Sequence, residues 1–333
     1  MSHASTNFFP MSPATRISGP FAHKSLSVFF LHDESRSGAV PLSLNEALLD
    51  KTFRVEETGN IHALSIENLG KSDVFVQAGD LVKGGRQDRV LGVSMLVPVK
   101  SGRVPIAAYC VESGRWGQRG YEDTRGFTSS LHAFFSPRAK TALRRAAMSF
   151  DPEARRFADR EYAGFQRNVW DEVASTQSEL AAAVNKDVRS AASPTSLDLS
   201  LEQAQVQAAR NDYLQLLARA GAGDPSITGT FFAMNGAVRT GEIYPWSGLF
   251  QKMWDKNLSA SIMEALRTGN PGQAANLSPE AVRAMLLQAE AGAESQHPLP
   301  LGSWFRQRLS RSFAFLESCR PDGAWVHRSY FAH

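Results

Sequence analysis

The sequence predicts an α+β fold: a mostly antiparallel sheet with helices packed around it, to which strands from both chain ends contribute. Three observations predict it. Short β-branched, apolar runs separated by tight turns dominate residues 24–112, and apolar residues at helical spacing dominate 137–220. Strand patterns then return at 227–244 and near the C-terminus. Because short turns join neighbouring strands, we expect antiparallel pairing rather than a doubly wound parallel sheet.

The elements of the strand-rich part follow from period-two alternation and turn residues. In chain order we expect strands at 25–31, 53–57, 62–67, 73–77, 89–99 and 104–111, and a short helix at 44–49. Hairpin turns are expected at 58–60 and 100–103, where Gly stands among polar residues. Residues 1–20 lack periodicity and predict a loose tail, which leaves 21–330 as a single elaborated domain.

Helical patterns begin where Ser136 precedes Pro137, the residue types typical of a helix N-cap and first turn. In chain order we expect helices at 152–184, 201–218 and 247–267, and one that begins at Ser278, with a polar loop at 190–200. The strands at 227–244 are expected to turn at Asn235 and Gly236. The chain should end in two strands, 312–318 and 324–330.

Composition and charge argue against several classes of protein. The 333 residues carry 36 Lys and Arg against 33 Asp and Glu, so the net charge of +3 does not indicate a dedicated nucleic-acid or membrane-surface binder. The N-terminus shows no apolar signal segment, and no run of about 18 apolar residues is present to span a membrane. Two distant cysteines and eight scattered histidines predict neither a disulfide framework nor a metal site. We therefore expect a cytoplasmic location.

A Gly- and charge-rich segment at 79–89 is the first candidate for a functional site, because it stands at the entrance to an expected strand. Its candidate ligand-binding residues are Lys83, Gly84, Gly85, Arg86, Gln87 and Arg89. The cations can neutralise a phosphate or carboxylate, and the glycines would let backbone N–H groups approach such a ligand. The spacing matches neither a P-loop nor GxGxxG. A solvated loop with internal charge pairs explains the segment equally well.

A second polar segment follows the strand expected at 104–111. Its candidate ligand-binding residues are Ser113, Arg115 and Trp116. The turn at 100–103 should place Arg89 opposite the end of that strand, so the two segments are expected to line one pocket. A carboxylate at a strand end suits general acid–base chemistry, and the candidates are Glu112, Asp80 and Asp88. The alternative is that Glu112 only pairs with Arg115 or Arg86.

Five segments in this order carry a resemblance to a known family. They read QAGDLVKGGRQDR, VPIAAYCVESGRW, FQRNVWDEV, SPTSLDL and GEIYPWSGLFQKMWDKNLSASIMEAL. Over roughly 15–330 the chain resembles the ARPP-1 domain family, whose biochemical function is not known. Its name records an association with ADP-ribosylglycohydrolase and phosphatase-like proteins, which implies a role near ADP-ribose or nucleotide metabolism, or in prokaryotic conflict systems. The polar residues that match its motifs are Asp80, Lys83, Gly84, Gly85, Arg86, Gln87, Glu112, Ser113, Arg115, Trp116, Gln166 and Trp170.

Two functions remain open at this point. The first is an enzyme that acts on a phosphorylated, nucleotide-like molecule of the ADP-ribose type, in which Lys83, Arg86 and Arg115 hold phosphate. The second is a non-catalytic ligand- or protein-binding module, a sensor or adaptor in a conflict or regulatory system. A protein partner would then contact the helical region around Gln166 and Trp170. No cofactor is indicated. A catalyst should show a carboxylate beside cations in a closed cleft, and a binder an open apolar patch or a shallow basic surface.

Overall fold

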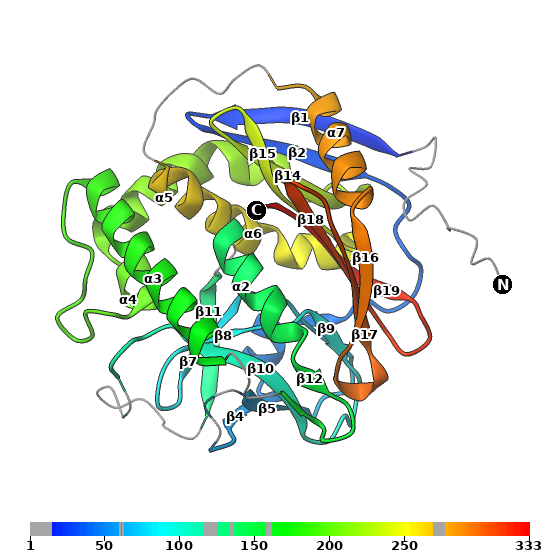
Figure 1. Ribbon diagram of the computed structural model, residues 1–333. Helices are drawn as coiled ribbons and strands as arrows, with labels where there is room; N and C mark the ends of the chain where they lie inside the picture. The colour runs from blue at the N-terminus through cyan, green and yellow to red at the C-terminus, as the bar shows by residue number, and fades with distance from the viewer. Residues whose placement is uncertain are drawn as a thin grey trace.

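The computed structural model describes residues 15–59, 61, 63–115, 117, 126–133, 136–157, 162–268 and 277–333. It confirms the α+β class, because helices pack around mostly antiparallel sheets that take strands from both chain ends (Figure 1). One short ladder is parallel, between β3 (Leu42–Ser43) and β6 (Val74–Val76). None of the helices in these residues is long and apolar enough to cross a membrane.

The larger sheet has eight strands and joins the two ends of the chain. Its order is β1 (Arg16–His23), β2 (Leu26–His32), β14 (Ile227–Met234), β15 (Ala237–Ile243), β19 (Trp325–Ala332), β18 (Phe313–Cys319), β17 (Trp304–Leu309) and β16 (Ala293–Pro298). The hairpin between β14 and β15 turns as expected at Asn235 and Gly236, both with positive φ. β1 begins at Arg16, inside the segment expected to be a tail, and residues 1–14 of that segment lie outside the described part.

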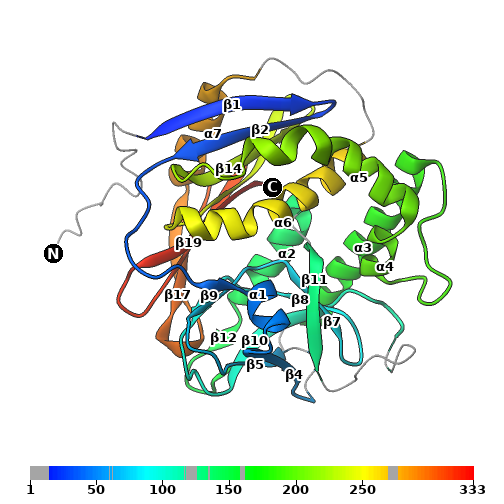
Figure 2. The same cartoon turned by 180° about the vertical axis from the view of Figure 1, so that it is seen from behind.

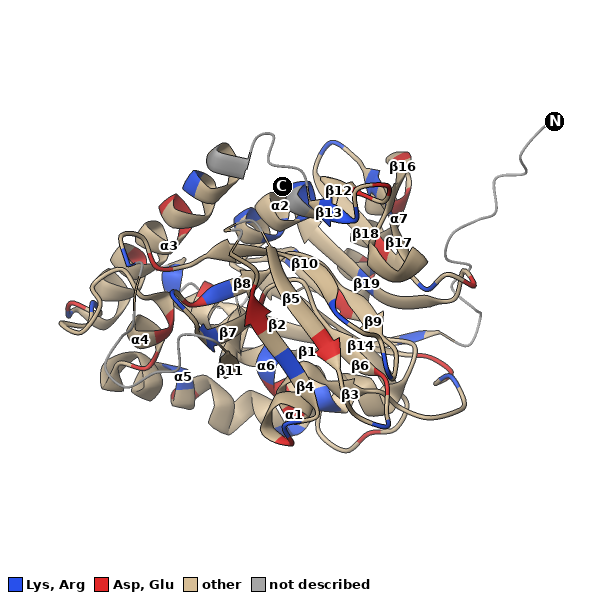
Figure 3. Ribbon diagram, turned by 90° about the horizontal axis from the view of Figure 1, so that it is seen from below, with Lys and Arg blue, Asp and Glu red and all other residues tan. Residues whose placement is uncertain are grey.

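A second sheet has six strands and carries the segments that the sequence singled out. Its order is β11 (Phe127–Ala133), β7 (Asp80–Gly84), β8 (Arg89–Leu91), β10 (Val104–Cys110), β5 (Ala63–Asn68) and β4 (Phe53–Glu57). Beside it lie β3, β6 and β9 (Met95–Val97), and a separate two-stranded ladder of β12 (Phe150–Asp151) and β13 (Arg156–Phe157). Charged residues of both signs are interspersed on β4 and β5 (Figure 3).

Two of the strand predictions are wrong in an informative way. The strand expected at 89–99 is two strands, β8 and β9, in different sheets, because the chain leaves the six-stranded sheet after Gly92 donates a hydrogen bond to Ala107. β9 pairs with β6 rather than β10, so 100–103 is not the turn of a hairpin. The segment expected to be a loop, 79–89, contains β7, because its buried Leu81 and Val82 pack between β8 and β11.

The helices cover the sheets as the patterns indicate. They are α1 (Leu44–Leu49), α2 (Pro137–Ala147), α3 (Tyr162–Val184), α4 (Leu197–Leu201), α5 (Ala204–Leu217), α6 (Ser247–Arg267) and α7 (Pro279–Glu290), with 3-10 turns at Ala218–Ala220 and Pro300–Gly302. Ser136 caps α2 by accepting a hydrogen bond from the Ala139 N–H. Residues 156–157, expected to be helical, form β13, and the helix expected at 201–218 is interrupted between α4 and α5.

Two apolar cores lie on opposite faces of the larger sheet. Phe30 and Phe232 face α6 and share one core with Leu91 and Ile106 of the six-stranded sheet. Their sequence neighbours Phe29 and Phe231 face the other way and pack with α7, as period-two alternation requires. Figures 1 and 2 show α6 and α7 on the two sides of this sheet. α2 also contacts the sheet at β19, and the contact between them matters for the site below.

Candidate functional site

The two polar segments predicted from the sequence lie side by side. Arg89 of β8 pairs with Cys110 of β10, the register expected. The Gly117 N–H donates to the Arg86 carbonyl at 3.2 Å, and the Gln87 amide donates to the Arg115 carbonyl. Trp116 lies outside the described residues.

Glu112 is at the centre of an ion-pair network between these segments. It is fully buried, and its carboxylate accepts hydrogen bonds from Arg115 Nε at 2.5 Å and from Ser193 Oγ at 2.5 Å. Arg115 Nη2 also lies 3.4 Å from the carboxylate of Asp88, which in turn accepts the Gly84 N–H at 3.0 Å. The network connects residues 84–88, 112–115 and 193 to one another.

The other predicted site residues also contact partners within the chain. Lys83 lies 2.8 Å from Asp198 and 2.9 Å from Glu202. The buried Arg89 guanidinium lies 3.2 Å from Glu57 and donates to Cys110 Sγ at 2.9 Å. Asp80 accepts from Lys256 at 2.8 Å, and the Ser113 carbonyl accepts from Thr195 at 2.5 Å. Gly85 has φ +56° and lies against the Phe127 ring, so its missing side chain makes room for that ring. Arg86 is exposed.

Gln166, predicted from the family resemblance, braces β10 rather than standing on the surface. Its side-chain amide donates to the Cys110 carbonyl at 2.7 Å and accepts the Cys110 N–H at 2.9 Å, so it continues the ladder beyond the strand edge. Trp170, one turn further along α3, is half-buried. Burial raises the pKa of the Cys110 thiol to about 11 although Arg89 opposes the shift, so Cys110 is a thiol rather than a thiolate at neutral pH.

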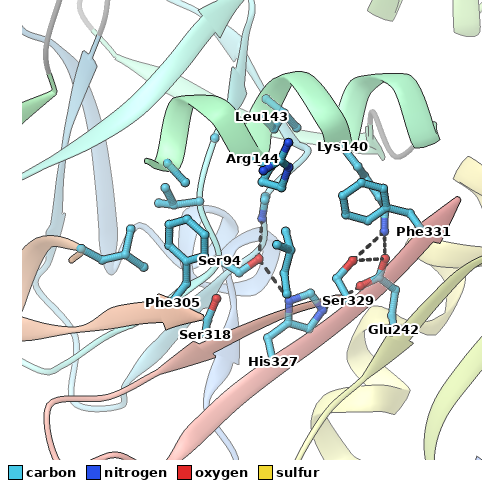
Figure 4. Close-up of a pocket in the computed structure, with 16 residues that line it drawn as sticks. Ser94, Lys140, Leu143, Arg144, Glu242, Phe305, Ser318, His327, Ser329 and Phe331 are labelled. Carbon is cyan, nitrogen blue, oxygen red and sulfur yellow. Dashed lines mark hydrogen bonds and ion pairs between the residues drawn. The ribbon is translucent and has the colours of Figure 1, made fainter. Parts of the chain in front are cut away.

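A separate pocket lies between α2 and the strands β15 and β19 (Figure 4). Its free volume is about 40 Å³, and none of the four pockets whose lining the structure describes is lined by the site residues predicted from the sequence. Apolar walls come from Leu143, Leu299, Phe305 and Phe331. The polar lining includes Ser94, Lys140, Arg144, Glu242, Ser318, His327 and Ser329.

Lys140, Glu242 and Ser329 form a buried cluster at one end of this pocket. The Lys140 ammonium forms an ion pair with Glu242 Oε1 and donates to Ser329 Oγ at 3.0 Å. Ser329 Oγ donates in turn to Glu242 Oε1 at 3.2 Å. Figure 4 shows the three side chains pointing toward one another, from α2, β15 and β19.

His327 extends the cluster toward Ser94. Its Nε2 lies 2.9 Å from Glu242 Oε2, a close charge contact in which neither atom makes a hydrogen bond within the described residues. Its Nδ1 lies 3.1 Å from Ser94 Oγ, which accepts the Ala78 N–H at 2.9 Å. Burial, and then the Lys140 charge, hold the pKa of His327 well below its usual value, so the imidazole is neutral at neutral pH.

The sequence held weak signals of this cluster, which the sequence interpretation missed. Lys140 stands at helical spacing with Leu143 and Ala147, on the face of α2 that turns inward. Glu242 and Ser329 are direct cross-strand partners, and His327 lies on the same face of β19 as Ser329. A Lys on an apolar helix face and a Glu inside a strand each indicate a partner. The sequence does not say that they are partners of each other.

The pKa of Lys140 gives a first testable prediction. Burial lowers it to about 7 from 10.5, so between these values the unfolded chain binds a proton that the folded chain does not. The free energy of unfolding should therefore rise from pH 7 to 10, by up to about 1.4 kcal/mol per unit, relative to Lys140→Met. Below pH 7 the difference should be flat. Urea denaturation of both proteins across this range measures it, and parallel curves would contradict it.

A wider groove lies on the other side of α2, between α2 and α3. Its volume is about 690 Å³, and it is lined by Arg138, Arg145 and Arg239 together with Asp171 and Glu172. Glu172 is already paired with Arg267 at 2.8 Å. No group of three or more His, Cys, Asp or Glu side chains that could hold a metal ion lies within the described residues.

The fold and the enclosed pocket define an α+β protein with a buried cluster of acid–base side chains. The chain belongs to the ARPP-1 family, the ARG and Rhodanese-Phosphatase-superfamily-associated Protein domain, whose model matches residues 14–331. No curated protein and no solved structure matches the chain.

Proposed function

We propose that the protein is an enzyme that acts on a small phosphorylated molecule, nucleotide-like and of the ADP-ribose type, and that its chemistry takes place in the pocket between α2, β15 and β19. One observation carries the proposal. Lys140, Glu242 and His327, three ionisable side chains, are buried together and line a cavity. This is a carboxylate beside a cation in an enclosed site, the arrangement expected of a catalyst.

The cost of burying these groups supports a functional role. Each charge removed from water costs several kcal/mol, and apolar residues of similar volume would often stabilise a core at least as well. The pKa of about 7 that burial gives Lys140 lets it accept or release a proton near neutral pH. A module that only binds a partner would need no such group beneath its surface.

Two observations support a phosphorylated substrate. Lys140 and Arg144 place two cationic groups in the pocket lining. The family name links these domains to phosphatase-superfamily proteins. The segment at 79–89 is not the phosphate site of this proposal, because Lys83 and Arg89 already pair with carboxylates of the chain. A cytoplasmic location, where nucleotides are abundant, belongs to the same proposal.

A thermal-shift screen with ADP-ribose, nucleotides and sugar phosphates tests the proposal. Wild type is compared with Lys140→Met in the pocket, Arg145→Ala in the groove and Arg86→Ala on the polar segment. We expect a ligand at 100 times its Kd to stabilise wild type, Arg145→Ala and Arg86→Ala by about 2.7 kcal/mol, and Lys140→Met far less. The proposal fails if no compound raises the melting temperature, or if only Arg145→Ala or only Arg86→Ala loses the shift.

The groove between α2 and α3 supports the second candidate, a non-catalytic binding module for an anionic ligand. Three arginines line an open surface there. The Arg145→Ala arm of the same screen decides between the two candidates, because Arg145 and Lys140 lie on different sides of one helix.

A further inference from the structure

We propose that Ser94, His327 and Glu242 form a nucleophile, base and carboxylate relay that cleaves a carboxylic ester through an acyl-Ser94 intermediate. The inference rests on the proposed function only in using the same pocket, and it names the reaction that takes place there. The three residues come from three distant parts of the chain, and each is buried.

Contacts on both sides of the imidazole support the relay. Glu242 Oε2 lies 2.9 Å from His327 Nε2 without a hydrogen bond between them, and a carboxylate that close favours a proton rather than a lone pair on Nε2. The neutral imidazole therefore carries its proton on Nε2, which leaves the Nδ1 lone pair directed at Ser94. Ser94 Oγ already accepts the Ala78 N–H, so its own hydrogen is available to His327 Nδ1, 3.1 Å away. This is the proton order that activates a serine.

The backbone explains how Ser94 reaches the pocket. It lies between β8 and β9, where the expected strand 89–99 is interrupted and the chain passes from one sheet to the other. The interruption places its side chain among the pocket residues instead of in a ladder. Ala78, which holds the hydroxyl, stands just before β7. A local break in a regular strand is a common way to aim a functional side chain.

The size and lining of the cavity favour a short acyl group. The free volume is only about 40 Å³, so a long acyl chain would have to displace the side chains of the lining. The apolar Leu143, Phe305 and Phe331 suit a methyl or ethyl chain. The phosphorylated part of a substrate would then lie toward the cations of the lining, Lys140 and the half-buried Arg144.

The reaction balances without any further reagent than water. Ser94 Oγ attacks the ester carbonyl carbon and gives its proton to His327 Nδ1, and the Glu242 carboxylate stabilises the imidazolium. The carbon–oxygen bond to the alcohol breaks, and the leaving oxygen takes the proton from Nδ1. Water then attacks the acyl-Ser94 carbonyl and passes a proton to Nδ1, and Ser94 Oγ takes that proton back as the carboxylic acid leaves.

p-Nitrophenyl acetate tests the inference on the full chain. We expect acid-quenched samples to carry an acetyl group on Ser94 by peptide mass spectrometry, with release of p-nitrophenolate. Ser94→Ala should lose both signals, and His327→Gln should slow them by roughly 10²–10⁴-fold. Ser261→Ala, a buried serine of α6 that does not line the pocket, should leave both unchanged. p-Nitrophenyl hexanoate should react far more slowly, because its chain exceeds the cavity.

Acetylation confined to lysines, or equal rates in wild type and Ser94→Ala, would overturn the inference. So would a His327→Gln protein, shown to be folded by circular dichroism, that acetylates Ser94 at the wild-type rate. These failures are separate from that of the proposed function. If a phosphorylated ligand stabilises wild type while Ser94 stays unmodified, the ester reaction is ruled out and the proposed function stands. If Ser94 is acetylated while no phosphorylated ligand stabilises wild type, the ester reaction stands and the proposed function fails.

Discussion

Replacing Glu242 with alanine is expected to lower the free energy of unfolding by about 3–5 kcal/mol at pH 6, because it leaves a buried ammonium without its carboxylate. Lys140 is buried in the same cluster, with only 7% of its side chain exposed to solvent. The loss should shrink at pH 9, since burial lowers the pKa of Lys140 and the neutral amine needs no counter-charge. Urea denaturation at the two pH values measures both effects.

The matched control is the double variant Lys140→Met, Glu242→Leu. It removes both charges and fills their space, so we expect its stability to lie within about 1.5 kcal/mol of wild type, well above that of Glu242→Ala. Lys140→Met alone should be destabilised, because it leaves Glu242 buried beside His327. If the double variant is as unstable as the sum of the single ones, the pair is not coupled and its description here is wrong.

Replacing Glu112 with glutamine is expected to cost about 3–5 kcal/mol of stability, the second large effect. Glutamine keeps the shape of the side chain but removes the negative charge that pairs with Arg115. The hydrogen bonds from Arg115 and Ser193 to Glu112 are each 2.5 Å long, and Glu112 itself is fully buried, so little solvent is present to compensate. Chemical denaturation measures the loss.

Glu202→Gln is the control, because Glu202 also pairs with a cation of the 79–89 segment but is half-exposed. Its cost should stay below about 1 kcal/mol. The same two proteins separate structure from catalysis once a substrate is known. A Glu112→Gln protein that keeps its melting temperature but turns over roughly 10²–10⁴-fold more slowly would restore Glu112 as a general acid or base.

Much of the fold could be predicted because it depends on local pattern. Alternation located β2, β4, β5, β6, β10, β14, β15, β18 and β19 to within a residue or two, and α1 has the predicted bounds. It did not predict β11, β16 or β17. The predictions failed where pairing between distant segments decides whether and where a strand forms. Leu81 and Val82 form a strand only because β8 and β11 flank them, and the 89–99 run divides because β6 offers β9 a second partner. Charged residues around β7 concealed the first, and the mostly apolar character of 89–99 on both sides of Gly92 and Ser94 concealed the second.

In the candidate site, too, local features could be predicted and those that depend on tertiary pairing could not. The pairing of Arg89 with Cys110 could be predicted because the two residues stand at about the same number of residues from the 100–103 connection between their strands. The pocket could not be predicted, because Ser94, Lys140, Glu242 and His327 are each unremarkable in their own segments. Only the pairing of β15 with β19, and the packing of α2 on β19, bring them together. The roles predicted for Glu112, Asp80 and Asp88 stay predictions.

The strand order of the larger sheet affects how the chain can fold while it is synthesised on the ribosome. Leu26 of β2 pairs with Met234 of β14, and β15 pairs with β19 at the end of the chain. β2 therefore emerges with an apolar open edge long before its partner is made, a state that invites aggregation. The contacts that close the sheet are among the most non-local a chain can form, which predicts slow folding. His327 lies on β19, so the pocket is assembled only after β19 has been synthesised.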